Sequence, residues 1–205
     1  MVRAVIFDSD GMITHGPRFS EVFSKEYRIP MENILPFFNG PFKQCLIGKA
    51  DLKQELRKGW LKQWEWSKSV EDFLAYWFSI GKELDKKVYE SILPIRRQGV
   101  TCILATNQEK YRTEFLIDVF HYRSIFDEVF SSAYVGSKKP QPDFFRAVFS
   151  FLKERQPGVR KDEVVFWDDD DNNLAGAKNF GFTVEKFTDA DSYLSTMRRL
   201  IGGFE

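Results

Sequence analysis

Short, continuously apolar runs recur along the chain and are separated by longer amphipathic stretches. The runs are rich in Val, Ile and Phe, and they occupy residues 2–7, 100–105, 128–131, 164–167 and 182–187. Strands that are buried on both faces of a parallel sheet have this composition. Between them, apolar residues return at intervals of three and four, as in amphipathic helices, over residues 111–120, 142–152 and 172–180. The alternation predicts an α/β fold with a Rossmann-like, doubly wound parallel sheet.

The interval between the first two apolar runs contains no convincing strand but several helix starts. Asp51 with Gln54, and Ser69 with Asp72, each place a capping side chain before an apolar run and an acidic or amide residue three positions later. Further along, Pro94 falls inside a helical pattern, where it removes a backbone donor and should kink or end the helix.

We therefore expect two domains, because a helical insertion follows the first strand. The α/β core domain is predicted to comprise residues 1–13 and 85–205, and the helical cap domain residues 14–84. The aromatic residues of the insertion are expected mostly to pack its own core; they are Phe37, Phe38, Phe42, Trp60, Trp64, Trp66, Phe73, Tyr76, Trp77 and Phe78.

Charge and cysteine content restrict the partners of the chain. Lys plus Arg and Asp plus Glu each number 30 among 205 residues, so no overall field attracts the chain to nucleic acid or to an anionic membrane. Two cysteines are too few for a disulfide framework, which favours a reducing compartment. The sequence lacks a secretion leader and an apolar run of about 20 residues that could cross a bilayer. We expect a cytoplasmic protein with a small-molecule partner, and the sequence does not indicate an oligomeric state.

Polar segments follow the apolar runs, at the strand ends where open parallel sheets bind ligands. In the first segment, Asp8 and Asp10 lie two positions apart, so both side chains can face one pocket while Gly11 lets the chain turn. Two adjacent carboxylates repel each other unless a cation or a shared proton compensates, and an oxygen-only pair suits Mg²⁺. The alternative is an ordinary Asp-Gly turn at the end of a strand.

An acidic run follows the fourth apolar run and continues from Asp168 to Asp171, before Asn172 and Asn173. Carboxylates at a helix N-terminus are stabilising by themselves, because they meet free N–H groups and the helix dipole. Four in a row exceed that need. We interpret part of the run as a metal site shared with Asp8, since the two strands can be neighbours in the sheet.

Two further segments offer groups that bind phosphate. Thr106 and Asn107 supply a hydroxyl and amide donors after the second apolar run, although such residues are also common helix caps. Lys139, fixed by the proline that follows it, can hold a positive charge over a phosphate, or it can lie in a solvated loop. Together the four segments supply what phosphoryl transfer requires, which is charge neutralisation and in-line positioning.

The order of these segments resembles the haloacid dehalogenase superfamily over almost the whole chain. FDSDGM is similar to its first motif, LATN to its second, SKKPQPDFF to its third, and FWDDDDNN with AGAKNFGF to its fourth. Each motif alone is weak evidence, whereas four in the same order are specific.

The resemblance implies a role for each matching residue. It implies four catalytic residues, Asp8, Asp10, Thr106 and Lys139, and two substrate-binding residues, Asn107 and Gly11. Asp8 would be the nucleophile that forms an aspartyl-phosphate, and Asp10 the acid for the leaving group and then the base for water. Thr106 would bind the phosphoryl oxygens, and Lys139 would neutralise the phosphate and Asp8.

The resemblance also implies a Mg²⁺ site. Asp8, the Asp10 backbone carbonyl and Asp169 would bind the ion directly, Asp168 would support it through water, and Asn173 matches the family's Asn after the acidic pair. Asp10 distinguishes two branches, because dehalogenases place a tyrosine there and need no metal. The resemblance therefore favours a phosphatase with a helical cap. The run GPFKQCLIGKADLKQEL is similar to the cap of the glucose-1-phosphate phosphatase and epoxide-hydrolase N-terminal phosphatase group.

The predicted function is Mg²⁺-dependent hydrolysis of a small phosphate monoester, for example a sugar phosphate, through an aspartyl-phosphate on Asp8. A phosphosugar mutase, a 2-haloacid dehalogenase and a non-catalytic phosphate-binding module are the alternatives. His15 can reach a leaving group from its place beyond the first motif, or it is structural. Asp170 and Asp171 receive no role beyond surface solvation.

Overall fold

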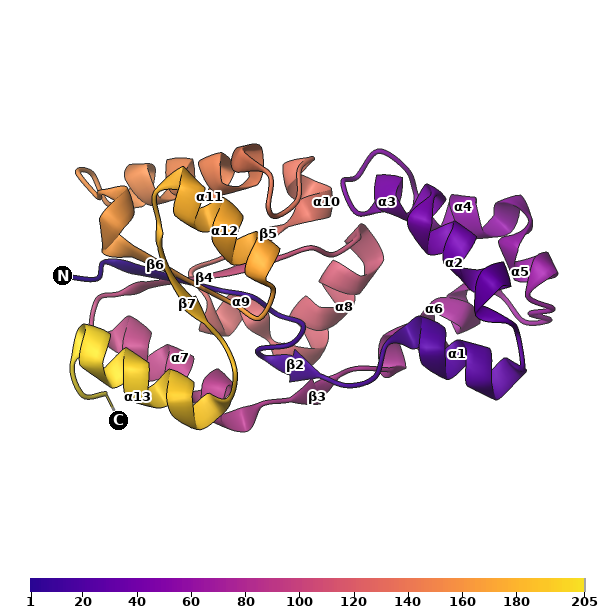
Figure 1. Ribbon diagram of the computed structural model, residues 1–205, viewed down its shortest axis with the longest axis horizontal. Coiled ribbons are helices and arrows are strands. Elements are labelled where there is room, and N and C mark those ends of the chain that lie inside the picture. The colour runs from indigo at the N-terminus through magenta and orange to yellow at the C-terminus, as the bar shows by residue number, and fades with distance from the viewer. Residues whose placement is uncertain (205) are drawn as a thin grey trace.

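The computed structural model describes residues 1–204, and a parallel sheet with helices on both faces forms its larger part (Figure 1). The sheet order is β5-β4-β1-β6-β7. The strands are β1 (Ala4–Phe7), β4 (Thr101–Thr106), β5 (Glu128–Ser131), β6 (Val164–Asp168) and β7 (Thr183–Lys186), and every pairing among them is parallel. The predicted Rossmann-like α/β fold is confirmed, and β1 lies between β4 and β6, the strands that carry the second and fourth motifs.

Helices cover both faces because side chains alternate along each strand. Val5 and Phe7 face one apolar cluster, whereas Ala4 and Ile6 face the other. Below the sheet in Figure 1 lie α7 (Lys86–Arg97) and α13 (Ala190–Ile201), and the same cluster takes side chains from α8 (Lys110–Phe120) and α9 (Tyr122–Ile125). The other face carries α10 (Ser132–Val135), α11 (Pro142–Arg155) and α12 (Asp171–Phe180), with a 3₁₀ turn at Lys161–Glu163.

Pro94 does not end its helix. Helix α7 continues past it to Arg97, so of the two predicted outcomes, a kink or an end of the helix, the end is wrong. Only one backbone donor is lost to the proline, while Val88, Ile92 and Ile95 of the same helix remain packed against the sheet. Packing of the apolar face therefore outweighs the missing hydrogen bond.

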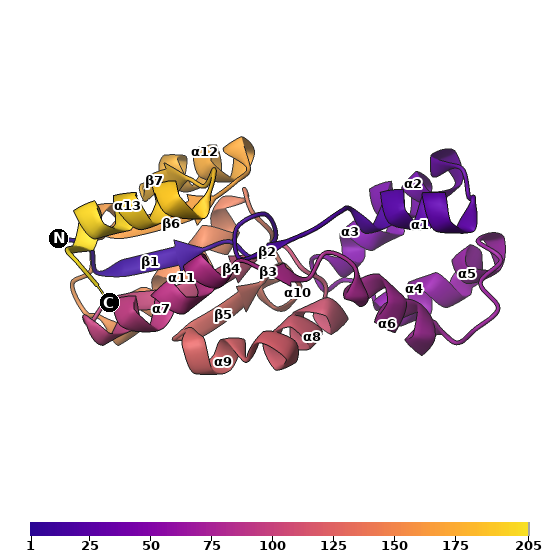
Figure 2. The ribbon, with the colours of Figure 1, turned by 90° about the horizontal axis from the view of Figure 1, so that it is seen from below.

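A group of helices stands beyond one end of the sheet, and we call the helices α1 to α6 the cap (Figure 2). They are α1 (Phe19–Tyr27), α2 (Met31–Asn39), α3 (Pro41–Cys45), α4 (Leu52–Glu55), α5 (Leu61–Gln63) and α6 (Val70–Ser79), with a π-helical turn at Leu56–Trp60. The two predicted helix starts are confirmed, since Asp51 accepts from the Gln54 N–H and Ser69 forms a capping box with Asp72. The exact division at residues 14–84 remains our proposal.

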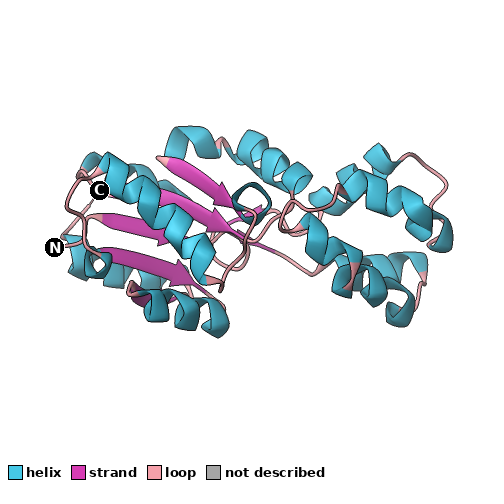
Figure 3. Ribbon diagram, turned by 90° about the horizontal axis from the view of Figure 1, so that it is seen from above, coloured by secondary structure: helices cyan, strands magenta, loops and turns pink. Residues whose placement is uncertain are grey.

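Two short strands join the cap to the sheet. Strand β2 (Thr14–His15) pairs antiparallel with β3 (Glu83–Leu84), so the expectation of no strand in this interval is wrong. A two-residue strand is too short to show an alternating pattern in the sequence. Figure 3 shows that the arrowheads of the sheet strands point toward the cap, so the strand ends that carry the motifs lie beneath it.

The aromatic side chains of the cap form a cluster separate from the two sheet clusters, as predicted. Phe23, Phe37, Trp64 and Phe73 are almost fully buried in it. Within residues 1–204, no helix is both long enough and apolar enough to cross a membrane.

Candidate active site

A buried lysine lies between two carboxylates at the end of the sheet. Lys139 is 1% exposed, and its Nζ donates to Asp8 Oδ1 at 2.6 Å and to Asp168 Oδ2 at 2.7 Å. Asp8 follows β1 and Asp168 ends β6, so parallel pairing brings the two side chains together. Burial and the neighbouring Asp168 raise the pKa of Asp8 to about 7, although Lys139 acts in the opposite direction. One ammonium faces two carboxylates, so this centre carries an excess of negative charge.

A third carboxylate makes the group suitable for a metal ion. One oxygen from each of Asp8, Asp168 and Asp169 lies within 4.8 Å of the others. Three carboxylate oxygens are the donor set that Mg²⁺ prefers, and a cation would offset their charge. A Cβ at Gly11 would lie 2.3 Å from Asp169 Oδ2, so a glycine with positive φ is required beside this site.

Asp168 is held in place from several sides. Asn173 Nδ2 donates to both of its oxygens at 3.1 Å, and the Asp170 N–H donates to Oδ1 at 2.9 Å. Asp168 is fully buried, whereas Asp169 is exposed. Burial and the charge of Asp168 raise the pKa of Asp169.

Asp10 points away from the lysine and into the space under the cap. Its carboxylate accepts from Thr14 Oγ1 at 2.9 Å, Gln108 Nε2 at 2.5 Å and Arg112 Nη2 at 3.1 Å. Its side chain is 48% exposed. Sequence reasoning missed Gln108 and Arg112. Gln108 lies in the turn that follows β4, whereas Arg112 lies in the first turn of α8 (Lys110–Phe120), so no periodic pattern in the sequence signals that both contact Asp10.

Thr106 is buried and ends β4, and Asn107 follows it directly. The Asn107 side chain donates to the Lys139 carbonyl at 3.0 Å and accepts from the Lys139 N–H at 2.9 Å. The amide is therefore engaged in fixing the backbone of the buried lysine.

Three residues without a firm prediction have structural partners. Asp170 caps the N-terminus of α12 by accepting from the Asn172 N–H at 2.7 Å, which corrects the expectation of solvation alone. Asp171 pairs with Lys186 at the surface. His15 Nε2 lies 3.6 Å from Asp85 Oδ2, and its ring stacks on Phe187.

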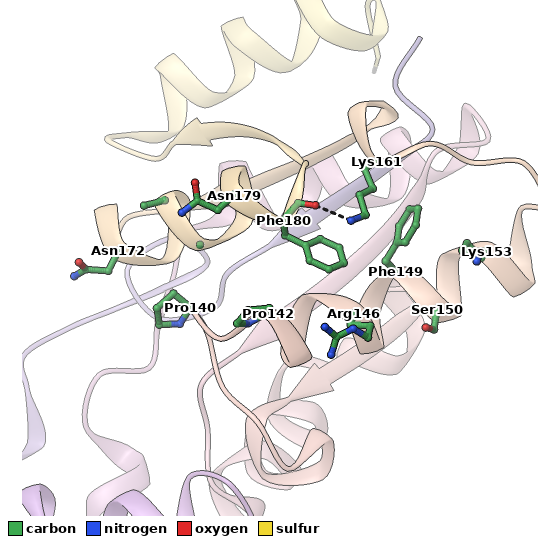
Figure 4. A pocket seen from close by; sticks show the side chains of 12 residues that line it. Pro140, Pro142, Arg146, Phe149, Ser150, Lys153, Lys161, Asn172, Asn179 and Phe180 are labelled. Carbon is green, nitrogen blue, oxygen red and sulfur yellow. Dashed lines mark hydrogen bonds between the residues drawn. The ribbon is translucent and has the colours of Figure 1, made fainter.

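A cavity of about 640 Å³ opens between the core and the cap, and Asp10, Gly11, Asn107 and Asp169 line its core side. A second cavity, of about 760 Å³, lies between α11 and α12 (Figure 4). None of the predicted site residues lines the second cavity, and Lys161 there donates to the Phe180 carbonyl at 2.8 Å. The cavity under the cap is therefore the candidate substrate site, although it is the smaller of the two.

Known proteins resemble the chain in sequence. Residues 2–181 match the family model of the haloacid dehalogenase-like hydrolases. Rat bifunctional epoxide hydrolase 2 is 24% identical over 98% of the chain, and the sesquiterpene phosphatase astK of Aspergillus oryzae is 25% identical over 58% of it. The chain spans 39% of the length of the rat protein and 58% of the fungal one.

Solved structures share the fold. A HAD family enzyme from Bacteroides thetaiotaomicron superposes with a TM-score of 0.82 at 19% identity, covering 96% of this chain and 98% of that one. The same enzyme in complex with magnesium and inorganic phosphate gives a TM-score of 0.76 at 20% identity, covering 92% of this chain and 95% of that one. At this identity the likeness concerns the fold.

Proposed function

Because this chain belongs to the haloacid dehalogenase-like hydrolases, we propose that it hydrolyses a small phosphate monoester with Mg²⁺ through an aspartyl-phosphate on Asp8. The observation that carries the proposal is the buried Lys139 between Asp8 and Asp168, with Asp169 beside them. A lysine so placed can neutralise both the nucleophile and the incoming phosphate, which is what phosphoryl transfer demands of a protein.

In the proposed reaction, Asp8 Oδ attacks phosphorus and the bond to the ester oxygen breaks. Asp10 gives a proton to the leaving alcohol and then removes one from the water that hydrolyses the aspartyl-phosphate. Lys139 and the Thr106 hydroxyl hold the phosphoryl oxygens. Gln108 and Thr14 orient the Asp10 carboxylate.

Mg²⁺ would be held by Asp8, Asp169 and the Asp10 backbone carbonyl, with Asp168 in support. When bound, it would neutralise phosphate charge that a single lysine cannot balance. The fit of the donor set to the ion supports this assignment. A relative named as a phosphatase, and a structural neighbour in complex with magnesium and inorganic phosphate, also support it. The acid at position 10 favours phosphate-ester chemistry over dehalogenation.

Release of phosphate from p-nitrophenyl phosphate tests the proposal. We expect turnover with Mg²⁺, loss of turnover after chelation, and a loss of at least about a thousandfold in kcat in Asp8→Asn, because no other group can form the intermediate. Asp118→Asn, an exposed change on α8, is the matched control and should behave like the unaltered protein. Full activity of Asp8→Asn with metal present would contradict the mechanism. Analysis of products from hexose phosphates separates hydrolysis from mutase activity, which yields an isomer.

A further inference from the structure

The cavity under the cap has two unlike walls. The core contributes Asp10, Gly11, Asn107 and Asp169, which surround the proposed phosphate position. The cap contributes a wall made largely of apolar side chains, including Leu35, Phe38, Phe42, Leu46, Trp77 and Phe78. The phosphoryl group and the leaving group of a bound ester would therefore meet different chemistry.

Six of these apolar side chains come from three helices, α2, α3 with its C-cap, and α6. Leu35 and Phe38 are three residues apart on α2, Phe42 and Leu46 are four apart on α3 and its C-cap, and α6 contributes the rest. The Trp77 ring lies 5.2 Å from that of Phe42 and 5.4 Å from that of Phe38, so the aromatic part of the wall is packed together.

The two leucines of this wall are not packed into a buried apolar cluster. Leu35 and Leu46 line the cavity but belong to none of the three buried apolar clusters among residues 1–204, and Leu35 is 39% exposed. An apolar ligand would remove this surface from water, which is the favourable term in its binding.

The polar groups that reach this cavity from α8 and the turn before it are already engaged. Gln108 donates to Asp10, and Arg112 donates to Asp10 and, at 3.4 Å, to the Gly81 carbonyl. Glu109 accepts from two backbone N–H groups at the start of α8. On the cap side, Arg18 and Ser20 are the charged and hydroxyl side chains.

We propose that the leaving group of the substrate is an apolar alcohol, with an alkyl chain or an aryl ring, and not a hydroxyl-rich sugar. The inference rests on the proposed function and concerns the same site. A sugar would bury several hydroxyl groups against leucine and aromatic side chains, and unpaired buried hydroxyls are costly. An alkyl or aryl group gains from the same contacts. This replaces the sugar phosphate that served as the example in the sequence-based prediction.

The first test compares kcat/KM for alkyl phosphates from ethyl to octyl, for 2-naphthyl phosphate, and for glucose 6-phosphate, all with Mg²⁺. We expect kcat/KM to rise by roughly two- to fourfold per added methylene until the wall is covered. Comparison of kcat/KM for octyl phosphate and for 2-naphthyl phosphate shows whether the site prefers an alkyl chain or an aryl ring. Equal or faster turnover of glucose 6-phosphate, or a flat series of alkyl phosphates, would overturn the proposal.

A second test removes the apolar wall at its two unburied leucines. In Leu35→Gln/Leu46→Gln, kcat/KM for octyl phosphate should fall at least about tenfold, since the octyl group loses apolar contact with both side chains, while kcat/KM for ethyl phosphate should fall by a clearly smaller factor. Leu93→Gln, an exposed change on α7, is the matched control. An unchanged rate with octyl phosphate, or an equal loss with both esters, would count against the proposal.

Failure of the proposed function is distinguishable from failure of this inference. If none of the esters releases phosphate, the hydrolase proposal falls, and binding still tests the substrate class. Calorimetry of the Asp8→Asn variant with Mg²⁺ then compares octyl phosphate with glucose 6-phosphate. Tighter binding of octyl phosphate supports the apolar site, and equal or tighter binding of the sugar phosphate overturns it.

Discussion

The two walls of the cavity differ in the polarity of their side chains. On the core side, polar side chains from the ends of β1, β4 and β6 bond to Lys139, which lies in the loop between α10 and α11. On the cap side, the wall is mostly leucine and aromatic carbon. Under the proposed function the two walls have different tasks, because the core would bind and transfer the phosphoryl group and the cap would select the group to which it is attached. Changes in the two walls should therefore have different kinetic effects.

The largest effect is expected at Lys139. Lys139→Met keeps the length of the side chain but leaves Asp8 and Asp168 facing each other without a cation. We expect kcat to fall by about a thousandfold or more, because the group that neutralises the phosphate is gone. Loss of one partner of a buried ion pair also costs about 3–5 kcal/mol of stability.

Phosphate release and urea unfolding measure these two quantities. Lys138→Met, the same change at the preceding and partly exposed residue, is the control. Activity within tenfold of the unaltered protein in Lys139→Met would mean that the lysine is structural.

Arg112 connects the two walls and should give the next largest effect. It bonds to Asp10 and to the carbonyl of Gly81, which lies where the chain returns from the cap. The segment that enters the cap and the segment that leaves it are in close contact there, because a Cβ added at Gly16 would lie 2.5 Å from the Gly81 Cα. Arg112 thus contacts both Asp10 and the segment that leads from the cap back to the core.

In Arg112→Met we expect kcat to fall roughly ten- to a hundredfold with a smaller change in KM, because proton transfer loses a positioned carboxylate while binding surface remains. Arg112→Lys should recover part of the loss, as one donor can still reach Asp10. Arg123→Met, exposed on α9, is the control. A change confined to KM, or no rescue by lysine, would show that Arg112 does not act through Asp10.

A hydrogen bond between the core and the cap should have a smaller effect on activity. The Tyr111 hydroxyl donates to Asp51 Oδ2 at 2.6 Å, which joins α8 of the core to the start of α4, and this bond raises the pKa of Tyr111 to about 12. Tyr111→Phe removes one hydrogen bond, worth about 1 kcal/mol. We expect faster amide exchange in α4 and a change of a few-fold in KM.

Tyr134→Phe is a matched control, because its hydroxyl also donates to a carboxylate at 2.6 Å but within the core. Equal exchange rates in α4 for both variants would mean that the Tyr111 bond does not hold the cap.

The core part of the site was predictable from the sequence because of a simple rule of parallel sheets. Residues that follow neighbouring strands meet at one edge, so Asp8, Thr106 and Asp168 come together whatever their distance along the chain. Gln108 and Arg112 were not predictable, because their contact with Asp10 depends on how a turn aims two side chains. Asp170 was interpreted as solvated since a run of acids does not reveal which one caps the helix.

The cap was predictable only in outline. Helix starts at Asp51 and Ser69 follow from local capping chemistry, and the aromatic residues signal a packed cluster. Which of them also face the cavity depends on helix crossing and rotation, and a pattern of apolar residues does not encode that. Leu35 and Leu46 are ordinary leucines in the sequence, and their exposure to the cavity emerges only from the fold.

The last prediction concerns the pH dependence of stability and lies on the core side. Burial raises the pKa of Glu109 from its ordinary 4.5 to about 7, although two N–H groups at the start of α8 act against this. A carboxyl whose pKa is higher in the folded chain favours folding in its protonated form. That contribution is complete below about pH 4.5 and is lost as the pH rises through about 7.

Glu109→Gln keeps an acceptor for the helix N-terminus but cannot titrate. Groups common to both proteins cancel in the comparison, so the free energy of unfolding of the variant should rise relative to the unaltered protein between pH 4.5 and 7 and then stay constant. Urea unfolding at pH 5 and pH 8 measures this change, and Glu90→Gln, exposed on α7, should show none. The opposite result would be that the unaltered protein becomes more stable relative to the variant as the pH rises. The N–H groups that Glu109 caps would then affect the pKa of its carboxyl more than burial does.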